Sequence, residues 1–390
     1  MQDNSSPATT ADMPLDPVKL AQDLIRLPSV TPVADNTMDL LERVLGALGF
    51  TVHRMTFEEP GTEPVPNLYA RIGTTAPNLC FAGHTDVVPT GKPASWSHDP
   101  FGADIVDGQL YGRGAADMKS SIASFIAAAS KALRDGTLQG SLSLLITGDE
   151  EGPAINGTVK VLQWLKERGE VLDYCLVGEP TNPNHLGEMV KIGRRGSLHG
   201  HVTVHGTQGH VAYPHHAHNP IPDLVKLLST LDFTLDDGNA FFQPSNLEIV
   251  KLHVDNDREN VIPAEAFAHF NVRFNTVWTP DTLKAKLAER MDSAGVRYDI
   301  HWHVSGDAFL TPEGPLSEAV SRAIALEVGH KPVLSTTGGT SDARFIKDVC
   351  PVVEFGLVGQ TMHKIDEHVA VSDITTLANI YHHIIEDLAG

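Results

Sequence analysis

The spacing of apolar residues divides the first half of the chain into alternating helices and strands. Helical periodicity runs over 16–27 and 36–48, and Gly49 follows the second run, where a glycine commonly ends a helix. Further helices are expected over 118–133 and 159–167, and short apolar runs predict strands at 51–56, 67–72, 78–82, 141–147 and 174–177. This alternation predicts an α/β domain, a mixed sheet with helices on both faces.

The pattern changes near Arg195. Alternation typical of half-exposed strands covers 197–205, 247–254, 265–274 and 297–304, with helical runs at 220–231 and 280–294. This βαββαβ order predicts an inserted ferredoxin-like α+β domain. After Asp307 the α/β style resumes, with a helix at 316–328, a strand at 352–355 and a closing helix from Asp373. We expect a loose tail at 1–14, a main domain built from 15–194 and 309–390, and an inserted domain at 195–308.

Composition narrows the class of protein. A formal net charge of -20 argues against nucleic-acid binding, which selects for basic faces. The three cysteines form no CxxC pair, so neither a disulfide framework nor a thiolate zinc site is indicated, and a reducing cytoplasm fits this usage. Residues 1–14 lack the features of a secretory signal, and no apolar run approaches the roughly 18–20 residues that span a membrane.

Five short segments carry the candidate chemistry, and in four of them an ionisable residue follows an apolar strand or abuts a glycine. They are 83–86 (GHTD), 112–119 (GRGAADMK), 148–152 (GDEEG), 178–181 (GEPT) and 361–363 (TMH). The carboxyl ends of strands are where α/β sheets place ligands. Carboxylates and imidazoles gathered there need a partner, and a metal is the simplest one. Mixed His, Asp and Glu ligation without thiolate suits zinc, with manganese or cobalt as substitutes.

Each segment alone has an ordinary structural interpretation. A lone histidine such as His84 is more often a satisfied structural residue than a ligand. The pair Glu150 and Glu151 could be a solvated turn, and Glu179 could simply begin one. Five ordered occurrences at junctions between strands and loops are hard to explain as independent surface accidents, so the joint pattern favours a metal site.

The same segments resemble those of the dinuclear zinc aminopeptidase and aminoacylase superfamily, which includes carboxypeptidase G-type enzymes and acetylornithine deacetylase. The resemblance runs from about Leu20 to the C-terminus. It implies a phosphorylase/hydrolase-like zinc exopeptidase domain, with the insertion serving as a lid and dimerisation domain. It also implies two zinc ions per chain, one bound by His84 and Glu179, the other by Glu151 and His363, with Asp117 bridging both and a cis peptide bond at Asp117–Met118.

The resemblance extends to the catalytic residues. Asp86 would orient the imidazole of His84 and select its tautomer. Two metals about 3.5–4 Å apart can hold a water between them and lower its pKa from about 15.7 toward about 7. Glu150 resembles the base that takes this proton and hands it to the leaving amine. Successive side chains of an extended turn point apart, so Glu151 can face the metal while Glu150 faces the water.

The inserted domain contributes a candidate of its own. His210 resembles the lid histidine that stabilises a tetrahedral oxyanion, often across a homodimer interface, and loss of one such donor typically costs about 3 kcal/mol of barrier. His215, His216 and His218 follow closely. A third metal site is the alternative for this run, but it lacks a carboxylate partner, and these histidines are expected at the surface.

The substrate contacts point to an anionic acyl-amino acid. Arg194 and Arg273 can pair bidentately with carboxylates. Gly339, Thr340 and Ser341 precede an expected helix, whose free N–H groups suit a carboxylate, although a simple helix cap is the structural alternative. The segments 194–197 and 338–342 resemble the branch of the family whose substrate carries a succinyl carboxylate at one end and amino-acid carboxylates at the other. The same likeness adds Ser197, Tyr213 and Asn260 as contacts.

Two alternatives accompany this expectation of a metal-dependent amide hydrolase. One is another acyl-amino-acid amidohydrolase or a dipeptidase, and the other is a metal-dependent binding protein that has kept the fold without catalysis. The chain also departs from the family pattern, since Gly359 and Gln360 stand where an asparagine is usual, Ile365-Asp366-Glu367 stands where an Asn-Glu pair is common, and Ala343 replaces a frequent glycine. None of these touches an expected metal ligand.

Overall fold

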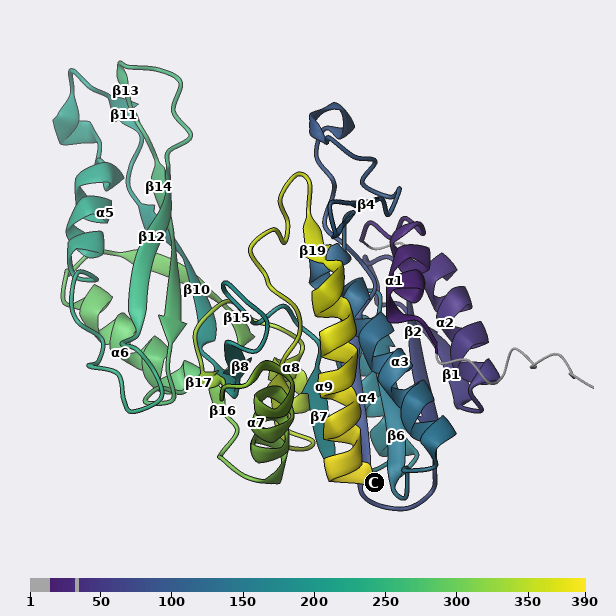
Figure 1. Ribbon diagram of the computed structural model, residues 1–390. Coiled ribbons are helices and arrows are strands. Elements are labelled where there is room, and N and C mark those ends of the chain that lie inside the picture. Colours follow the sequence, from purple (N-terminus) through teal and green to yellow (C-terminus); the bar gives the residue numbers. More distant parts are fainter. Residues whose placement is uncertain (1–14, 32–34) are drawn as a thin grey trace, which may run out of the picture. The chain divides into compact units, whose positions relative to one another are not determined.

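The computed structural model describes residues 15–31 and 35–390 (Figure 1). The expected tail at 1–14 lies outside the described residues. Contacts divide the chain into two compact units. Unit 1 takes the chain up to Ile192 together with Thr311–Ser335 and Ser341–Gly390, and unit 2 takes Gly193–Leu310 and Thr336–Thr340. The expected insertion at 195–308 falls within two residues of the longer segment of unit 2, while 336–340 was expected in the main domain.

Unit 1 is built on an eight-stranded mixed sheet. In spatial order its strands are β1 (Thr51–Phe57), β2 (Val65–Ile72), β6 (Ser141–Thr147), β3 (Asn78–His84), β7 (Tyr174–Val177), β18 (Val352–Glu354), β8 (Met189–Lys191) and β17 (Val333–Ser335). The four central strands β6, β3, β7 and β18 run parallel. Their carboxyl ends therefore meet at one edge of the sheet.

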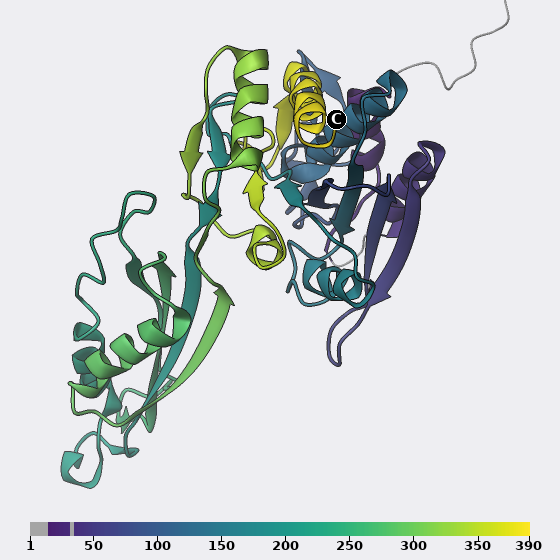
Figure 2. The same cartoon turned by 90° about the horizontal axis from the view of Figure 1, so that it is seen from below.

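Helices cover both faces of this sheet (Figure 2). One layer contains α1 (Pro17–Ile25), α3 (Ser120–Asp135), α7 (Pro315–Val328) and α9 (Val371–Ala389). The other contains α4 (Thr158–Glu167) and α8 (Ala343–Ile346), while α2 (Asp35–Ala47) packs on β1 and β2. Every residue of β6 is buried, as expected for a strand covered on both sides. The predicted α/β arrangement is confirmed.

Short elements complete unit 1. Strands β4 (Ile105–Val106), β5 (Gln109–Tyr111) and β19 (His368–Ala370) form a small separate sheet. A single turn, η1, spans Pro93–Ser95, and an irregular turn, η2, spans Ala115–Lys119. The helix expected from Met118 begins at Ser120 instead, because Asp117 and Met118 have non-helical backbone angles. None of the helices in the described part of the chain is long and apolar enough to cross a membrane.

Unit 2 has the expected βαββαβ order. Its elements are β10 (Gly196–His205), α5 (Pro220–Ser229), β12 (Asn246–His253), β14 (Glu265–Phe274), α6 (Pro280–Asp292) and β15 (Tyr298–Gly306). The sheet order β12-β14-β10-β15, with every pair antiparallel, is that of a ferredoxin-like sandwich. One face packs Leu198, Val202 and Phe270 into the core with the two helices. Small ribbons pair β9 (Gly193–Arg194) with β16 (Phe309–Leu310) and β11 (Gly209–His210) with β13 (Val261–Ile262), and η3 covers Pro214–His216.

Candidate metal centre

Three parallel strands deliver candidate ligands to one edge of the sheet. His84 is the last residue of β3 and lies opposite Thr147, the last residue of β6. Glu150 and Glu151 follow β6, and Glu179 follows β7 by two residues. The shared register explains why residues far apart in the sequence meet here.

The glycines before two of these ligands have a packing role. A Cβ on Gly83 would lie 2.5 Å from the Met118 side chain, and one on Gly178 would lie 2.7 Å from the same methyl group. Met118 is fully buried. The two glycines therefore leave room for Met118 and bring its neighbour Asp117 beside the strand ends.

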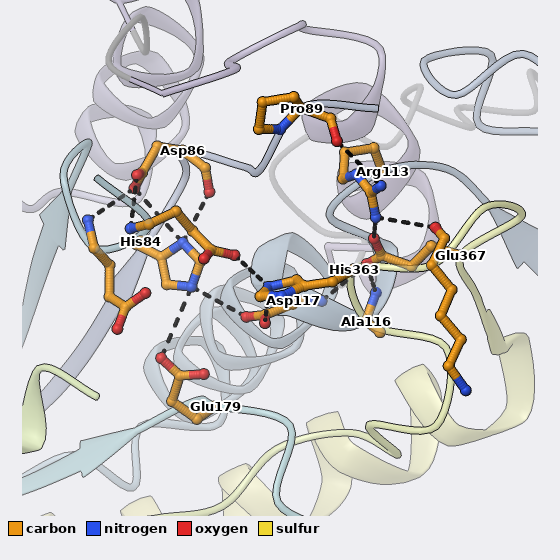
Figure 3. Close-up of polar contacts among 12 residues, drawn as sticks. His84, Asp86, Pro89, Arg113, Ala116, Asp117, Glu179, His363 and Glu367 are labelled. Carbon is orange, nitrogen blue, oxygen red and sulfur yellow. Dashed lines mark hydrogen bonds and ion pairs between the residues drawn. The ribbon is translucent and has the colours of Figure 1, made fainter. Parts of the chain in front are cut away.

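Asp117 lies between two histidines, with one carboxylate oxygen toward each (Figure 3). Its Oδ1 is 3.1 Å from Nε2 of His84, and its Oδ2 is 3.3 Å from Nε2 of His363. The peptide bond between Asp117 and Met118 is cis, as the family resemblance implied. This is the arrangement expected of a carboxylate that bridges two cations.

Each histidine has a second carboxylate beside it. Nε2 of His84 is 3.8 Å from Oε1 of Glu179, and Nε2 of His363 is 2.7 Å from Oε1 of Glu151. His363 has a positive φ of 62°, which is uncommon for a residue with a side chain and is typical of functional positions. The structure thus gathers the five expected metal ligands around one point.

The ionisable groups of this cluster perturb one another strongly. Burial raises the pKa of Glu150 and of Glu179 well above the ordinary value, and neighbouring carboxylates such as Asp117 add to this effect. Burial opposes protonation of His84, but the contact with Asp117 and the negative charges of Glu179 and Asp86 outweigh it and raise the pKa of His84. Hydrogen bonds to Asp117 and Glu151 raise the pKa of His363 to about 10.

The cluster fits a pair of divalent cations. His84 with Glu150 and Glu179, and His84 with Asp117 and Glu151, each place three ligand atoms within 4.8 Å of one another. The donors are imidazole nitrogens and carboxylate oxygens, which suit zinc, cobalt or manganese. Four carboxylates face two imidazoles, so two doubly charged cations would supply the positive charge that these carboxylates need.

Asp86 contacts His84, the residue that it was expected to orient. Its backbone oxygen accepts a hydrogen bond from Nδ1 of His84 at 2.8 Å, whereas its carboxylate is 3.6 Å away from that nitrogen. The carboxylate instead accepts from the backbone N–H groups of Glu150 and Glu151, at 3.2 and 3.0 Å. Asp86 therefore positions both the imidazole and the two-glutamate turn.

A buried ion pair that sequence reasoning missed holds the Asp117 turn. Oε2 of Glu367 accepts from Arg113 at 2.6 Å, and its Oε1 accepts from the backbone N–H groups of Ala116 and Asp117, at 2.9 and 3.2 Å (Figure 3). Glu367 is 0% exposed and Arg113 2%. The presence of Arg113 in one motif and of Glu367 just after another was the only available signal.

Lys119 anchors the same turn from the other side. Its Nζ donates to the backbone oxygens of Leu24 and Leu27, at 3.1 and 2.9 Å. Burial lowers the pKa of this fully buried amine to about 7. Lys119 belongs to the segment 112–119, but its residue type alone indicates no role for it.

The candidates in unit 2 form two separate groups. His210 and Tyr213 have ring centroids 5.6 Å apart, and the backbone oxygen of Asn260 accepts from Val211. In the second group Arg194 donates to the backbone oxygen of Gly339 at 3.1 Å. Ser197 lies opposite Arg273 in the sheet. The first group follows β10 and the second lies at its start.

The segment around Gly339 divides between the two units. Thr340 belongs to unit 2, whereas Ser341 belongs to unit 1. Ser341 is 1% exposed, and its hydroxyl donates to Glu354 at 2.8 Å. Ser341 thus forms a buried contact at the carboxyl end of β18.

A profile described as Peptidase family M20/M25/M40 matches residues 80–387. The chain therefore belongs to this family of metal-dependent hydrolases, and the family resemblance seen in the sequence is confirmed. Within the family it is 57% identical to the succinyl-diaminopimelate desuccinylase of Rhodospirillum centenum, over 95% of this chain and 97% of that protein. The succinyl-diaminopimelate desuccinylase of Xanthobacter autotrophicus is also 57% identical, over 94% and 97%.

Solved structures agree on the fold. An M20 family metallo-carboxypeptidase from Sulfolobus solfataricus superimposes with a TM-score of 0.79 at 18% identity, covering 96% of this chain and 99% of that one. The aminopeptidase PepT of Bacillus cereus gives 0.76 at 20% identity, covering 96% and 98%. The predicted combination of an exopeptidase-type sheet domain with an inserted antiparallel domain is thus confirmed.

Proposed function

We propose that the chain hydrolyses the amide bond of N-succinyl-LL-2,6-diaminopimelate, giving succinate and LL-2,6-diaminopimelate, an intermediate of lysine biosynthesis. The observation that carries the hydrolysis is the carboxylate of Asp117, which offers one oxygen to each of two histidines. Identities of 57% to named desuccinylases over nearly the whole chain support the choice of substrate.

The proposed cofactor is a pair of zinc ions, with cobalt or manganese as substitutes. His84 and Glu179 would hold one ion, Glu151 and His363 the other, and Asp117 both. When bound, such a pair polarises an amide carbonyl and makes a water molecule acidic enough to react near neutral pH.

Glu150 is the proposed general acid and base. It is adjacent to the ligand Glu151, and Asp86 holds both backbone N–H groups of this pair. Its carboxylate takes a proton from the attacking water and gives it to the departing amine, so that no charged amide nitrogen has to leave. The burial that raises its pKa also makes it a stronger base for this transfer.

Recognition of the substrate is assigned to cationic and hydroxyl groups of unit 2 with Ser341. Arg194 and Arg273 would pair with carboxylates, joined by Ser197, Gly339 and Thr340. Tyr213 and Asn260 would contact the substrate beside His210. Ser341 would contribute through its hydrogen bond to Glu354 rather than by contacting the substrate directly.

The proposed assembly is a homodimer in which His210 serves the partner's site. Strand β10 separates Ser197 from His205 by eight residues, or about 26 Å at 3.3 Å per residue, and His210 lies beyond that end. One copy of unit 2 therefore does not bring Arg194 and His210 to the same small substrate, whereas two copies can. Three free cysteines fit the proposed cytoplasmic location.

Comparing turnover of N-succinyl-LL-2,6-diaminopimelate with that of acetylornithine and a dipeptide panel tests the substrate. We expect kcat/KM for the succinylated compound to exceed the others by at least 100-fold, roughly the effect of one lost charge pair of about 3 kcal/mol. Preference for acetylornithine or a dipeptide would mean that the chain hydrolyses the amide bond of a different substrate. A protein that binds two metals and hydrolyses none of these would instead be a binding protein.

A further inference from the structure

Two histidine pairs lie on the outer face of the unit 2 sheet. β10 contains His199-Gly200-His201, and β15 contains His301-Trp302-His303. Successive side chains of a strand point to opposite faces, so both histidines of each pair share one face. The opposite face is the core face, where Leu198 and Val202 are buried. The histidines therefore project away from the core.

The strand register sets these histidines opposite one another. His199 lies opposite His303, and His201 opposite His301. On its other side His201 lies opposite His269 of β14. Residues directly opposite in antiparallel strands have Cβ atoms about 4.5–5.5 Å apart. His201 is thus the centre of a row of three imidazoles across three strands.

The rings are neighbours across the strands, although among the described residues no three of their nitrogens lie within 4.8 Å of one another in this arrangement. Centroids are 4.0 Å apart for His201 and His269, 6.1 Å for His201 and His301, and 5.6 Å for His199 and His303. His201, His301 and His303 are exposed. Their rings can therefore turn about the χ2 bond, which is the motion needed to point three nitrogens at one ion.

The electrostatics around His199 and His269 favour neutral imidazoles. Among the described residues, no carboxylate is paired with any of the five, in contrast to His205, which contacts Glu265 at 3.1 Å and Asp299 at 2.8 Å. Partial burial and the positive charge of neighbours lower the pKa of His199 and of His269. A neutral imidazole is the form that binds a metal.

We propose that the cluster of His199, His201, His269, His301 and His303 is a metal site separate from the candidate catalytic centre. It takes one divalent transition ion of the class of Zn²⁺, Ni²⁺ or Cu²⁺, for which imidazole is a preferred ligand. His201 supplies the central nitrogen, and its cross-strand neighbours supply the others. Zinc–nitrogen bonds of about 2.0–2.1 Å are within reach once the exposed rings rotate.

Another histidine run in the same unit provides a matched control. His215 and His216 are exposed, with ring centroids 4.1 Å apart, but they are neighbours in the short turn η3. His218, which follows, is paired with Asp223 at 2.6 Å. This run is therefore also rich in histidine, but its histidines do not form a row across three strands.

Equilibrium dialysis against micromolar free zinc at pH 7.5 tests the site. The parent, H201Q/H301Q and H215Q/H216Q proteins are compared for zinc bound per chain, with circular dichroism and turnover as checks of folding. We expect the parent and H215Q/H216Q to bind one zinc per chain more than H201Q/H301Q, with turnover equal in all three. The single variant His201→Gln, at an exposed position, should lose the same zinc.

Equal zinc in the parent and in H201Q/H301Q would overturn the proposal, as would equal losses in the two double variants. Zinc at the catalytic centre contributes the same amount to all of these proteins, so the difference between them reports on the sheet face alone. A failure of the proposed hydrolysis would leave this difference unchanged.

Discussion

At the scale of the residue, two adjacent glutamates are assigned different tasks. Glu151 contacts His363 at 2.7 Å, as a shared ligand would, whereas Glu150 is the proposed base. Replacing Glu150 with alanine should lower kcat by about 10²–10⁴-fold, the usual contribution of general acid and base catalysis, while the catalytic centre keeps its two zinc ions.

The neighbouring substitution is the control for that experiment. Glu151→Ala should lower metal content as well as activity, because it removes a ligand. Metal analysis and steady-state turnover on both proteins separate the two roles. Near-parental activity in the Glu150→Ala protein would contradict the assignment of the base.

The histidines of the centre predict how zinc binding depends on pH. Contacts with Asp117 and Glu151 raise the pKa of His363 to about 10, so at pH 7 this imidazole holds a proton when no metal is bound. A ligand nitrogen must be unprotonated, so zinc uptake should release protons, and zinc affinity should fall as pH falls. Calorimetry in buffers with different ionisation enthalpies measures the release. Uptake without proton release would contradict a protonated His363 in the metal-free protein.

At the scale of the element, the turn η2 and the segment before β19 depend on one buried ion pair. Replacing Glu367 with alanine leaves the guanidinium of Arg113 without its carboxylate and frees the N–H groups of Ala116 and Asp117. Loss of one partner of a buried pair typically costs about 3–5 kcal/mol. We expect a cost at the lower end of this range, because Arg113 keeps its contact with the backbone oxygen of Lys364.

Urea denaturation of metal-free protein measures this change in the free energy of unfolding. Lys364→Ala is the control, since only the backbone of Lys364 is used and its exposed side chain should matter by less than about 0.5 kcal/mol. Zinc affinity should also fall in the Glu367→Ala protein alone. A loss below about 1 kcal/mol would argue against the proposed role of the pair.

Elements long enough to show a repeating apolar pattern could be predicted from the sequence. The positions of their strand ends could be predicted as well. β3, β6 and β7 are largely apolar, and parallel strands align their carboxyl ends, so His84, Glu150 and Glu179 could be expected together. The strands β8, β9 and β17 have only two or three residues, too few to display a period, and they were missed.

Contacts between distant segments could not be predicted in the same way. Arg113 and Glu367 are 254 residues apart, and no periodicity connects them. Asp86 was expected to orient His84, but the sequence does not tell that its backbone oxygen makes the contact. Such details depend on how turns pack, which residue types alone do not specify.

At the scale of the whole molecule, the two groups of candidates at opposite ends of β10 predict a shared active site. If His210 serves the partner's site, a mixed dimer of one His210→Ala chain and one Glu150→Ala chain contains one complete site. Each variant alone should lose at least about 10²-fold in kcat, the usual cost of one oxyanion donor.

Mixing the two inactive proteins under conditions that exchange subunits tests this arrangement. Activity should return to roughly one quarter of the parental value, since random pairing makes half of the dimers mixed and each has one working site. Mixing His210→Ala with itself is the control. No recovery, with exchange verified by mass, would place His210 in its own chain's site or outside catalysis.

The most direct test of the central claim measures zinc per chain and hydrolysis of N-succinyl-LL-2,6-diaminopimelate in one titration. Metal-free protein is given increasing zinc, and both quantities are followed. We expect no turnover without metal and full turnover once the catalytic centre holds two ions, whereas Asp117→Ala should neither bind two ions at this centre nor reach full turnover. Turnover in the metal-free protein, or undiminished turnover and zinc content in Asp117→Ala, would contradict this claim.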